Sequence, residues 1–191
     1  ATGFYITGQP LDQYAPKLEN LPRIGSLQPD TVRDKQVVRI GGMLTEATRI
    51  TTKKGDTMCF ATVEDFTDSI EVTVFPRTFY QNMNLLVPDM PGVAQGHIDM
   101  TDETVKLIAD SVWALKDYRF AYYIELPAGG LPEVKRTEMK QLIAAHHGDY
   151  ATFFHSGGHW QKARENFWLD DAAETFERLT AIVGAGKVRK R

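Results

Sequence analysis

The residues of this chain whose types and spacing suggest chemistry lie in the stretch Arg49–Phe75, RITTKKGDTMCFATVEDFTDSIEVTVF. Two lysines, Lys53 and Lys54, stand before two runs in which apolar and polar residues alternate, and the runs carry Phe60 and Phe75. Ammonium groups neutralise phosphates, and aromatic rings stack on bases. The combination therefore predicts a surface that binds single-stranded nucleic acid.

Alternation along the two runs predicts which side chains point into a barrel. The small and branched residues fall on one face, and Phe60 and Phe75 fall on the other. The inward set is Cys59, Ala61, Val63, Ile70, Val72 and Val74. A four-residue turn at Phe66–Ser69 predicts that Phe60 lies directly opposite Phe75. The two rings would then form an exposed platform, worth about 1–3 kcal/mol for each stacked base.

Positive charge is predicted to gather beside this platform. We expect Arg49, Lys53 and Lys54 in the loop between the first and second strands, within reach of the phosphates of a bound strand. Arg39 and Arg77 are candidates for extending the basic track. The alternative is that other parts of the chain cover the rings and that TTKKGD is a solvated turn.

Composition limits the class of protein. The chain has 191 residues, a hydrophobic fraction of 42% and a net charge of −3, so any binding to phosphates must come from a local cluster. No apolar run approaches the roughly 20 residues of a membrane helix, and we expect no membrane partner. The single cysteine, Cys59, favours a reducing cytoplasm. Because the chain begins at Ala1 without methionine, we expect a piece of a longer protein.

The order of predicted elements divides the chain into three regions. Residues 1–35 are rich in proline and predict a short helical connector. Residues 36–116 predict strand, strand, strand, helix, strand and strand, the order of a five-stranded Greek-key OB barrel, with a bulge or bend at Gly41-Gly42. Residues 117–191 predict a small α+β interaction domain of β-α-β-β-α-β order, typical of the ferredoxin-like pattern.

Three segments resemble the C-terminal part of the α subunit of bacterial DNA polymerase III: GFYITGQPLDQY, RITTKKGDTMCFATVEDFTDSIEVTVFP and TVKLIAD. The resemblance covers residues 3 to about 115 and departs at Gln9, where the family commonly has histidine. It implies an OB barrel that binds single-stranded template DNA, and a terminal domain that contacts the clamp-loader τ subunit and other replisome proteins. The DNA-facing residues carried over are Arg49, Lys53, Lys54, Phe60 and Phe75.

Catalysis is expected elsewhere in the parent nucleotidyltransferase. That reaction needs carboxylates that hold two metal ions about 4 Å apart, whereas the neighbours Glu64 and Asp65 face opposite ways on a strand. His155 and His159 flank a turn without a cysteine or a nearby acidic third ligand. We therefore expect no catalytic residue, no metal site and no cofactor in this chain.

Two other functions remain open at this point. One is an RNA-binding OB module of the tRNA anticodon type, which competition between tRNA and single-stranded DNA would distinguish. The other is a protein-interaction module whose barrel face is covered by a partner.

Overall fold

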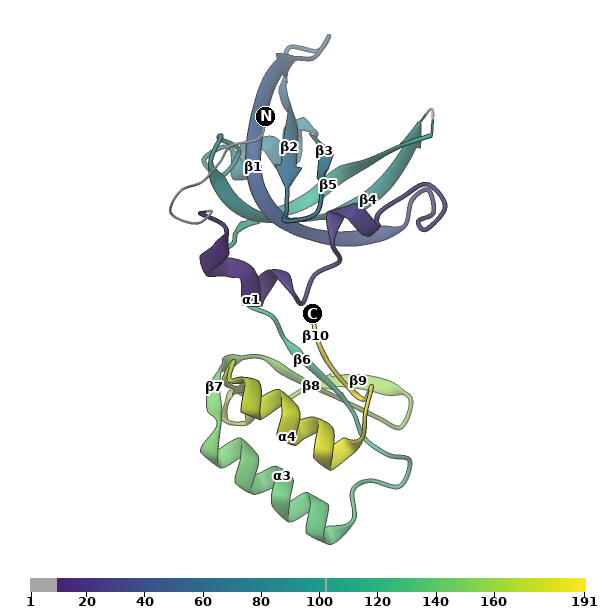
Figure 1. Cartoon of the computed structure of the whole chain (residues 1–191), viewed down its shortest axis with the longest axis vertical. Coiled ribbons are helices and arrows are strands. Elements are labelled where there is room, and N and C mark those ends of the chain that lie inside the picture. The colour runs from purple at the N-terminus through teal and green to yellow at the C-terminus, as the bar shows by residue number, and fades with distance from the viewer. Residues whose placement is uncertain (1–9, 102) are drawn as a thin grey trace. The chain divides into compact units, whose positions relative to one another are not determined.

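The computed structural model describes residues 10–101 and 103–191 (Figure 1). The chain divides into two compact units, Ala1–Tyr118 and Arg119–Arg191. The first nine residues of the expected connector, including Gln9, lie outside the described residues. No helix in the described part of the chain is long and apolar enough to cross a membrane.

Five strands of the first unit close into a barrel in the order β1-β2-β3-β5-β4. The elements are β1 (Val37–Thr51), β2 (Thr57–Glu64), β3 (Ser69–Val74), α2 (Pro76–Asn82), β4 (Met90–Thr101) and β5 (Thr104–Ala114). The long β1 pairs with β4 along its first half and with β2 along its second half, while β3 and β5 close the barrel as a parallel pair. The predicted five-stranded OB barrel is confirmed.

Glycines in β1 let neighbouring backbone approach closely. A Cβ atom on Gly42 would lie 2.4 Å from the carbonyl oxygen of Glu64, so no larger residue fits there without movement. The bulge predicted at Gly41-Gly42 is nevertheless misplaced, because the shift in register lies between Leu44 and Glu46. These glycines permit close packing, and the irregularity in pairing follows them along the strand.

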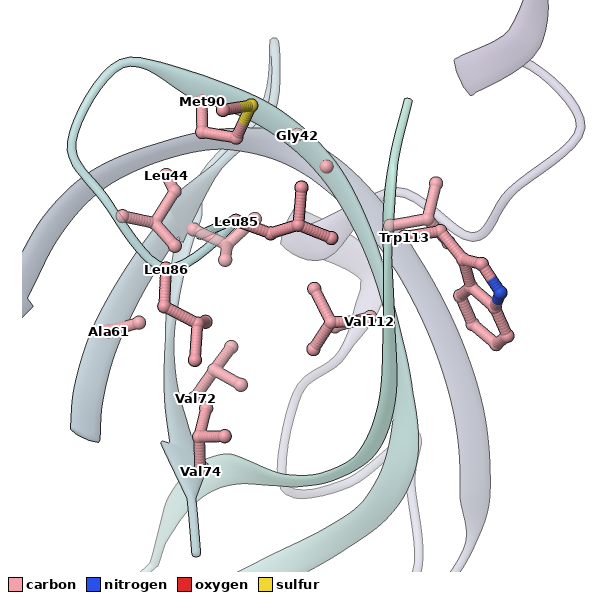
Figure 2. Close-up of a pocket in the computed structure, with 14 residues that line it drawn as sticks. Gly42, Leu44, Ala61, Val72, Val74, Leu85, Leu86, Met90, Val112 and Trp113 are labelled. Atoms are coloured by element: carbon pink, nitrogen blue, oxygen red, sulfur yellow. The ribbon is translucent and has the colours of Figure 1, made fainter. Parts of the chain in front are cut away.

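The barrel interior is filled by the predicted inward set. All six of its residues are buried in one hydrophobic core. Figure 2 shows Leu85 and Leu86, from the segment after α2, inserted among side chains of the barrel strands, whereas the ring of Trp113 points away. The space left has a volume of about 20 Å³, enough for about one water molecule. The interior is therefore a packed core and not a ligand pocket.

The connector packs on the barrel through short helices. It contains 3-10 helices at Asp12–Tyr14 and Ile24–Ser26 and the single-turn α1 (Ala15–Leu18). The Lys17 ammonium donates to the carbonyl oxygens of Leu115 and Tyr118 at 2.9 and 3.0 Å. These contacts fasten the connector to the segment that follows β5.

The second unit is a four-stranded sheet with two helices on one side (Figure 1). Its elements are β6 (Tyr122–Glu125), α3 (Glu133–Ala145), β7 (His147–Tyr150), β8 (Thr152–Ser156), β9 (His159–Lys162), a 3-10 helix (Glu165–Phe167), α4 (Ala173–Val183) and β10 (Val188–Lys190). The strand order is β10-β6-β8-β9. Apolar residues of α3 and α4 share a core with β6 and β10.

With β7 set aside, the elements of this unit run in the predicted β-α-β-β-α-β order, but their ferredoxin-like arrangement is wrong. A split β-α-β unit places another strand between its two parallel strands, whereas here β6 and β8 are direct parallel neighbours. The hairpin turn at Gly157-Gly158 lays β9 against the other edge of β8. Strand β8 therefore has β6 on one edge and β9 on the other, and no strand lies between β6 and β8.

Candidate nucleic-acid interface

The outer face of β1, β2 and β3 carries Phe60 near its centre. Phe60 pairs with Thr48 of β1 and with Thr73 of β3. Its neighbours Cys59 and Ala61 belong to the buried core, so Phe60 points away from the interior. The side chain is half-buried and offers only part of its ring to solvent.

Phe75 lies on the same outer face but not directly opposite Phe60. β3 ends at Val74, which pairs with Cys59, and extended backbone carries Phe75 one position further. Phe75 and Phe60 are therefore diagonal neighbours, a relationship that separates Cα atoms by about 7–8 Å and keeps large side chains within reach. The predicted direct pair is wrong by two residues in register. Phe75 is 47% exposed.

The turn between β2 and β3 explains this difference. The Asp65 carboxylate accepts hydrogen bonds from the N–H groups of Thr67 and Asp68 at 2.7 and 3.0 Å. The N–H of Asp65 also donates to the carbonyl of Asp68 at 3.0 Å. The turn therefore spans residues 65–68 instead of 66–69. Moving the turn by one residue shifts the pairing by two, so every side chain keeps its predicted face.

The loop between β1 and β2 holds two lysines on an ordered tip. The N–H of Thr52 donates to the carbonyl of Asp56 at 2.7 Å, and the N–H of Gly55 donates to the carbonyl of Thr52 at 2.9 Å. Gly55 has a φ of +89°, which glycine adopts without strain. Lys53 and Lys54 are exposed, and neither forms an ion pair with a described residue. Their charges are available to phosphates.

Tyr80 of α2 is an exposed aromatic residue that sequence reasoning missed. Its hydroxyl accepts a hydrogen bond from the N–H of Thr57, the first residue after the lysine-bearing loop, at 2.9 Å. Phe79 is buried, and Tyr80, about 100° further around the helix, is 51% exposed. Helical periodicity in PRTFYQN is the signal that would have indicated an outward Tyr80.

Arg49 and Arg77 flank this end of the barrel in different ways. Arg49 lies within β1 and not in the loop, so its predicted place is wrong. It pairs with Cys59 on the inward-facing row, and its guanidinium carbon lies 5.4 Å from the centroid of the Phe79 ring. Arg77 is exposed in the first turn of α2, two residues after Phe75.

Arg39 is held by partners on the β4 side of the barrel. Its Nε donates to the side-chain oxygen of Gln95 at 2.9 Å, and its guanidinium also donates to the hydroxyl of Tyr118. The guanidinium carbon lies 5.8 Å from the ring centroid of Trp113 and 5.7 Å from that of Tyr118. These contacts join β1 to β4 and to the segment after β5. They do not involve β2, which carries Phe60.

Charge on the outer face is uneven. Lys106 of β5 and Glu71 of β3 neutralise each other, with nitrogen and oxygen 3.0 Å apart. Lys53 and Lys54 leave the end next to their loop more positive. Among residues 10–101 and 103–191, no group of three or more His, Cys, Asp or Glu side chains is arranged to hold a metal ion.

Four residues lie at or beside the end of β1–β3 next to the loop, and Phe60 lies further along the outer face of β2; the five together are termed the barrel-rim surface. They are Lys53, Lys54, Phe60, Phe75 and Tyr80.

Comparison with known proteins agrees with this geometry. Residues 38–115, less than half of the chain, match a family described as an OB-fold nucleic acid binding domain. The chain is 30% identical over 127 residues to DNA polymerase III subunit alpha of Treponema pallidum, covering 66% of this chain and 11% of that protein. It is 30% identical over 156 residues to the same subunit of Mycobacterium tuberculosis, covering 76% and 13%.

The chain resembles part of the DNA polymerase III α subunit, and the match fits the C-terminal OB region of that subunit. The resemblance predicted from the sequence is confirmed. A third relative, the α subunit of Halalkalibacterium halodurans, is 29% identical over 154 residues and is covered to 14%. The chain therefore spans roughly a tenth to a seventh of the length of these curated relatives.

Solved structures are similar to the chain only at a distance. A mitochondrial single-stranded DNA binding protein from S. cerevisiae superimposes with a TM-score of 0.36 at 13% identity, covering 43% of this chain and 96% of that one. Asparaginyl-tRNA synthetase from Pyrococcus horikoshii gives a TM-score of 0.40 at 13% identity, covering 49% of this chain and 22% of that one.

Proposed function

We propose that the barrel binds single-stranded template DNA across the barrel-rim surface, as part of a replicative DNA polymerase. In this proposal, bases stack on Phe75, Tyr80 and the exposed part of Phe60. Lys53 and Lys54 neutralise the adjoining phosphates. The observation that carries the proposal is the presence of two half-exposed rings, Phe75 and Tyr80, beside a lysine pair that forms no ion pair with the described residues.

Stacking suits a strand whose sequence varies. Every base has a π-face, so a ring contributes about 1–3 kcal/mol per base with little regard to identity. A template must be held whatever its sequence, and base-specific hydrogen bonds would oppose that. Aromatic rings at the rim meet this requirement.

Electrostatics set the strength of the contact. The chain carries a net charge of −3, so it does not attract DNA as a whole, and the lysine loop must supply the attraction locally. Arg77 and Arg49 stand near this end and extend the positive region, whereas the partners of Arg39 hold it elsewhere. We expect modest affinity that falls as the salt concentration rises.

The wider role is part of the same proposal. The matched relatives carry the name DNA polymerase III subunit alpha, and this chain covers 11% to 14% of three of them. Nucleotidyl transfer is assigned to other parts of a parent protein, and this region is proposed to be non-catalytic. Residues 119–191 are proposed to bind the clamp-loader τ subunit within a cytoplasmic replisome.

Titration of a fluorescently labelled oligo(dT) with the protein tests the binding surface. We expect Phe75→Ala and Tyr80→Ala each to weaken binding about fivefold or more, because each removes one stacked base. Phe66→Ala is the matched control: Phe66 is 48% exposed but lies in the turn at the other end of the β2–β3 hairpin.

Two results would reject the proposal. One is wild-type affinity in the Phe75→Ala and Tyr80→Ala variants. The other is a clear preference for a tRNA anticodon stem-loop over oligo(dT) in competition, which would favour the RNA-binding alternative.

A further inference from the structure

The terminal sheet has a second aromatic surface, on the side away from its helices. Tyr122 and Ile124 of β6 are buried against α3 and α4, so Tyr123 between them faces the opposite side. In β8, Phe154 packs against the same core, which places Phe153 and His155 on the opposite side. One side of this sheet is therefore an apolar core, and the other is lined by rings.

Four rings from three adjacent strands contact one another there. Tyr123 stacks on Phe153 with centroids 4.8 Å apart and planes 5° apart. Trp160 of β9 meets Tyr123 edge to face at 5.3 Å and lies 5.0 Å from His155. These four residues, Tyr123, Phe153, His155 and Trp160, are termed the terminal aromatic face. Because its neighbours fix its orientation while 44% of it stays exposed, Trp160 presents a held ring to solvent.

Cationic side chains border these rings in the same register. Arg189 pairs with Tyr123, and Lys162 pairs with Phe153, so each stands on the same side as the ring it adjoins. Both side chains are exposed. The single carboxylate of the row, Glu125, is shared between Lys187 at 2.7 Å and Arg189 at 3.5 Å. Two cations against one anion leave this edge positive.

We infer that the terminal aromatic face is a second binding site for single-stranded nucleic acid. Its exposed ring can take a base, and the cations on both sides of the ring cluster can take the flanking phosphates. The paired positions of this side contribute rings, cations and one carboxylate, and no aliphatic side chain. Aromatic residues and arginine are also enriched in protein contacts, so the charge decides between the two occupants. The excess of cations over the one carboxylate favours a polyanion. The inference does not depend on binding by the barrel.

Cross-linking of the whole chain locates the site. An oligo(dT) that contains 5-iodouracil is irradiated with the protein, and cross-linked peptides are identified by mass spectrometry. We expect adducts at Trp160 or Tyr123, and we expect them to persist in a Phe75→Ala, Tyr80→Ala double variant. Persistence in that variant separates this site from the barrel-rim surface.

Affinity measurements in the same double variant supply the second test. Trp160→Ala is expected to reduce the remaining affinity about fivefold or more, and Lys162→Glu with Arg189→Glu is expected to reduce it further at low salt. Phe167→Ala is the matched control, since Phe167 is 40% exposed and lies near Phe154 and Gln161 on the helix side of the sheet. Circular dichroism confirms that each variant is folded.

Three results would overturn the inference. Adducts confined to residues 10–118 would do so, and so would equal affinity in the Trp160→Ala and Phe167→Ala variants. The third is loss of self-association in Trp160→Ala, seen by sedimentation without any change in oligo(dT) binding, because it would assign the face to a protein contact.

Discussion

The barrel and the terminal sheet present aromatic side chains in different ways. On the barrel, exposed Phe75 and Tyr80 stand at one end, where a strand passes into a helix and a loop adjoins them. On the terminal sheet, the rings come from the middle of paired strands and contact one another. The first arrangement is a set of separate rings, and the second is a cluster.

This difference follows from how each unit pairs the edges of its sheet and covers the faces of that sheet. The barrel closes on itself, so its apolar residues turn inward, and rings that remain outside have few partners. The terminal sheet is open and covered by helices on one side, so its other side must stabilise its own aromatic residues. Separate rings offer several stacking positions, whereas a cluster offers one rigid position.

The largest expected effect is the loss of stability caused by a glycine substitution in one unit or the other. A Cβ atom on Gly96 would lie 1.9 Å from the carbonyl oxygen of Ile108 in the barrel, and one on Gly148 would lie 2.6 Å from the Cα of Asp170 in the terminal unit. We expect Gly96→Ala and Gly148→Ala each to destabilise its own unit by about 3 kcal/mol or more, because backbone atoms must move. Thermal unfolding followed by NMR resolves the signals of the two units.

Gly92→Ala is the matched control, since its Cβ atom would lie 3.3 Å from the carbonyl oxygen of Trp113. It should cost less than Gly96→Ala. If the NMR signals of both units were lost at the same temperature in the Gly96→Ala or Gly148→Ala variant, the two units would unfold together. They could then no longer be treated as independent.

A smaller effect separates the two surfaces by their charges. We expect Lys53→Ala with Lys54→Ala to weaken oligo(dT) binding and to lower the slope of log affinity against log salt by about 1.4, because each lost contact with a single strand removes about 0.7. Titrations over a series of salt concentrations measure the slope. Lys140→Ala, an exposed change on α3, should leave the slope unaltered. A slope unchanged in the double variant would remove the lysine loop from the binding surface.

The smallest expected effect compares one carboxylate from each unit. Burial opposes ionisation of Asp65, but hydrogen bonds from the Thr67 hydroxyl and from the N–H groups of Ile24, Thr67 and Asp68 outweigh it and lower the pKa of Asp65. Burial likewise opposes ionisation of Asp170. Hydrogen bonds from the Thr175 hydroxyl, from the N–H of Ala172 and from His146 outweigh it and lower the pKa of Asp170.

A lowered pKa contributes stability above the unfolded pKa of about 3.9, and this stability is lost as the pH falls through the folded pKa. In the Asp65→Asn variant, the free energy of unfolding of the barrel should therefore fall less steeply as the pH is lowered. In the Asp170→Asn variant, the same is expected of the terminal unit. Urea unfolding between pH 2 and pH 7 at about one-unit intervals measures both pH dependences. An unaltered pH dependence in a variant would show that its carboxylate is not the group that titrates.

Much of the barrel could be predicted because its information is local. Alternation assigned Cys59, Ala61 and Val63 to the interior, since successive side chains on a strand point to opposite faces. The order of strands and helix then selected the OB barrel. The positions of Phe60 and Phe75 relative to each other could not be predicted in this way, because register depends on where the turn begins.

By itself, the sequence determined the barrel, the inward and outward faces of β2 and β3, the lysine loop and the likeness to DNA polymerase III α subunits. Only the tertiary structure decided that Phe75 lies diagonal to Phe60, that Tyr80 stands beside the loop, and that β6 neighbours β8. The physical reason is the distance along the chain between the residues that determine each feature. The face of a side chain follows from its own strand, whereas register, helix placement and strand order follow from hydrogen bonds between residues far apart in the chain.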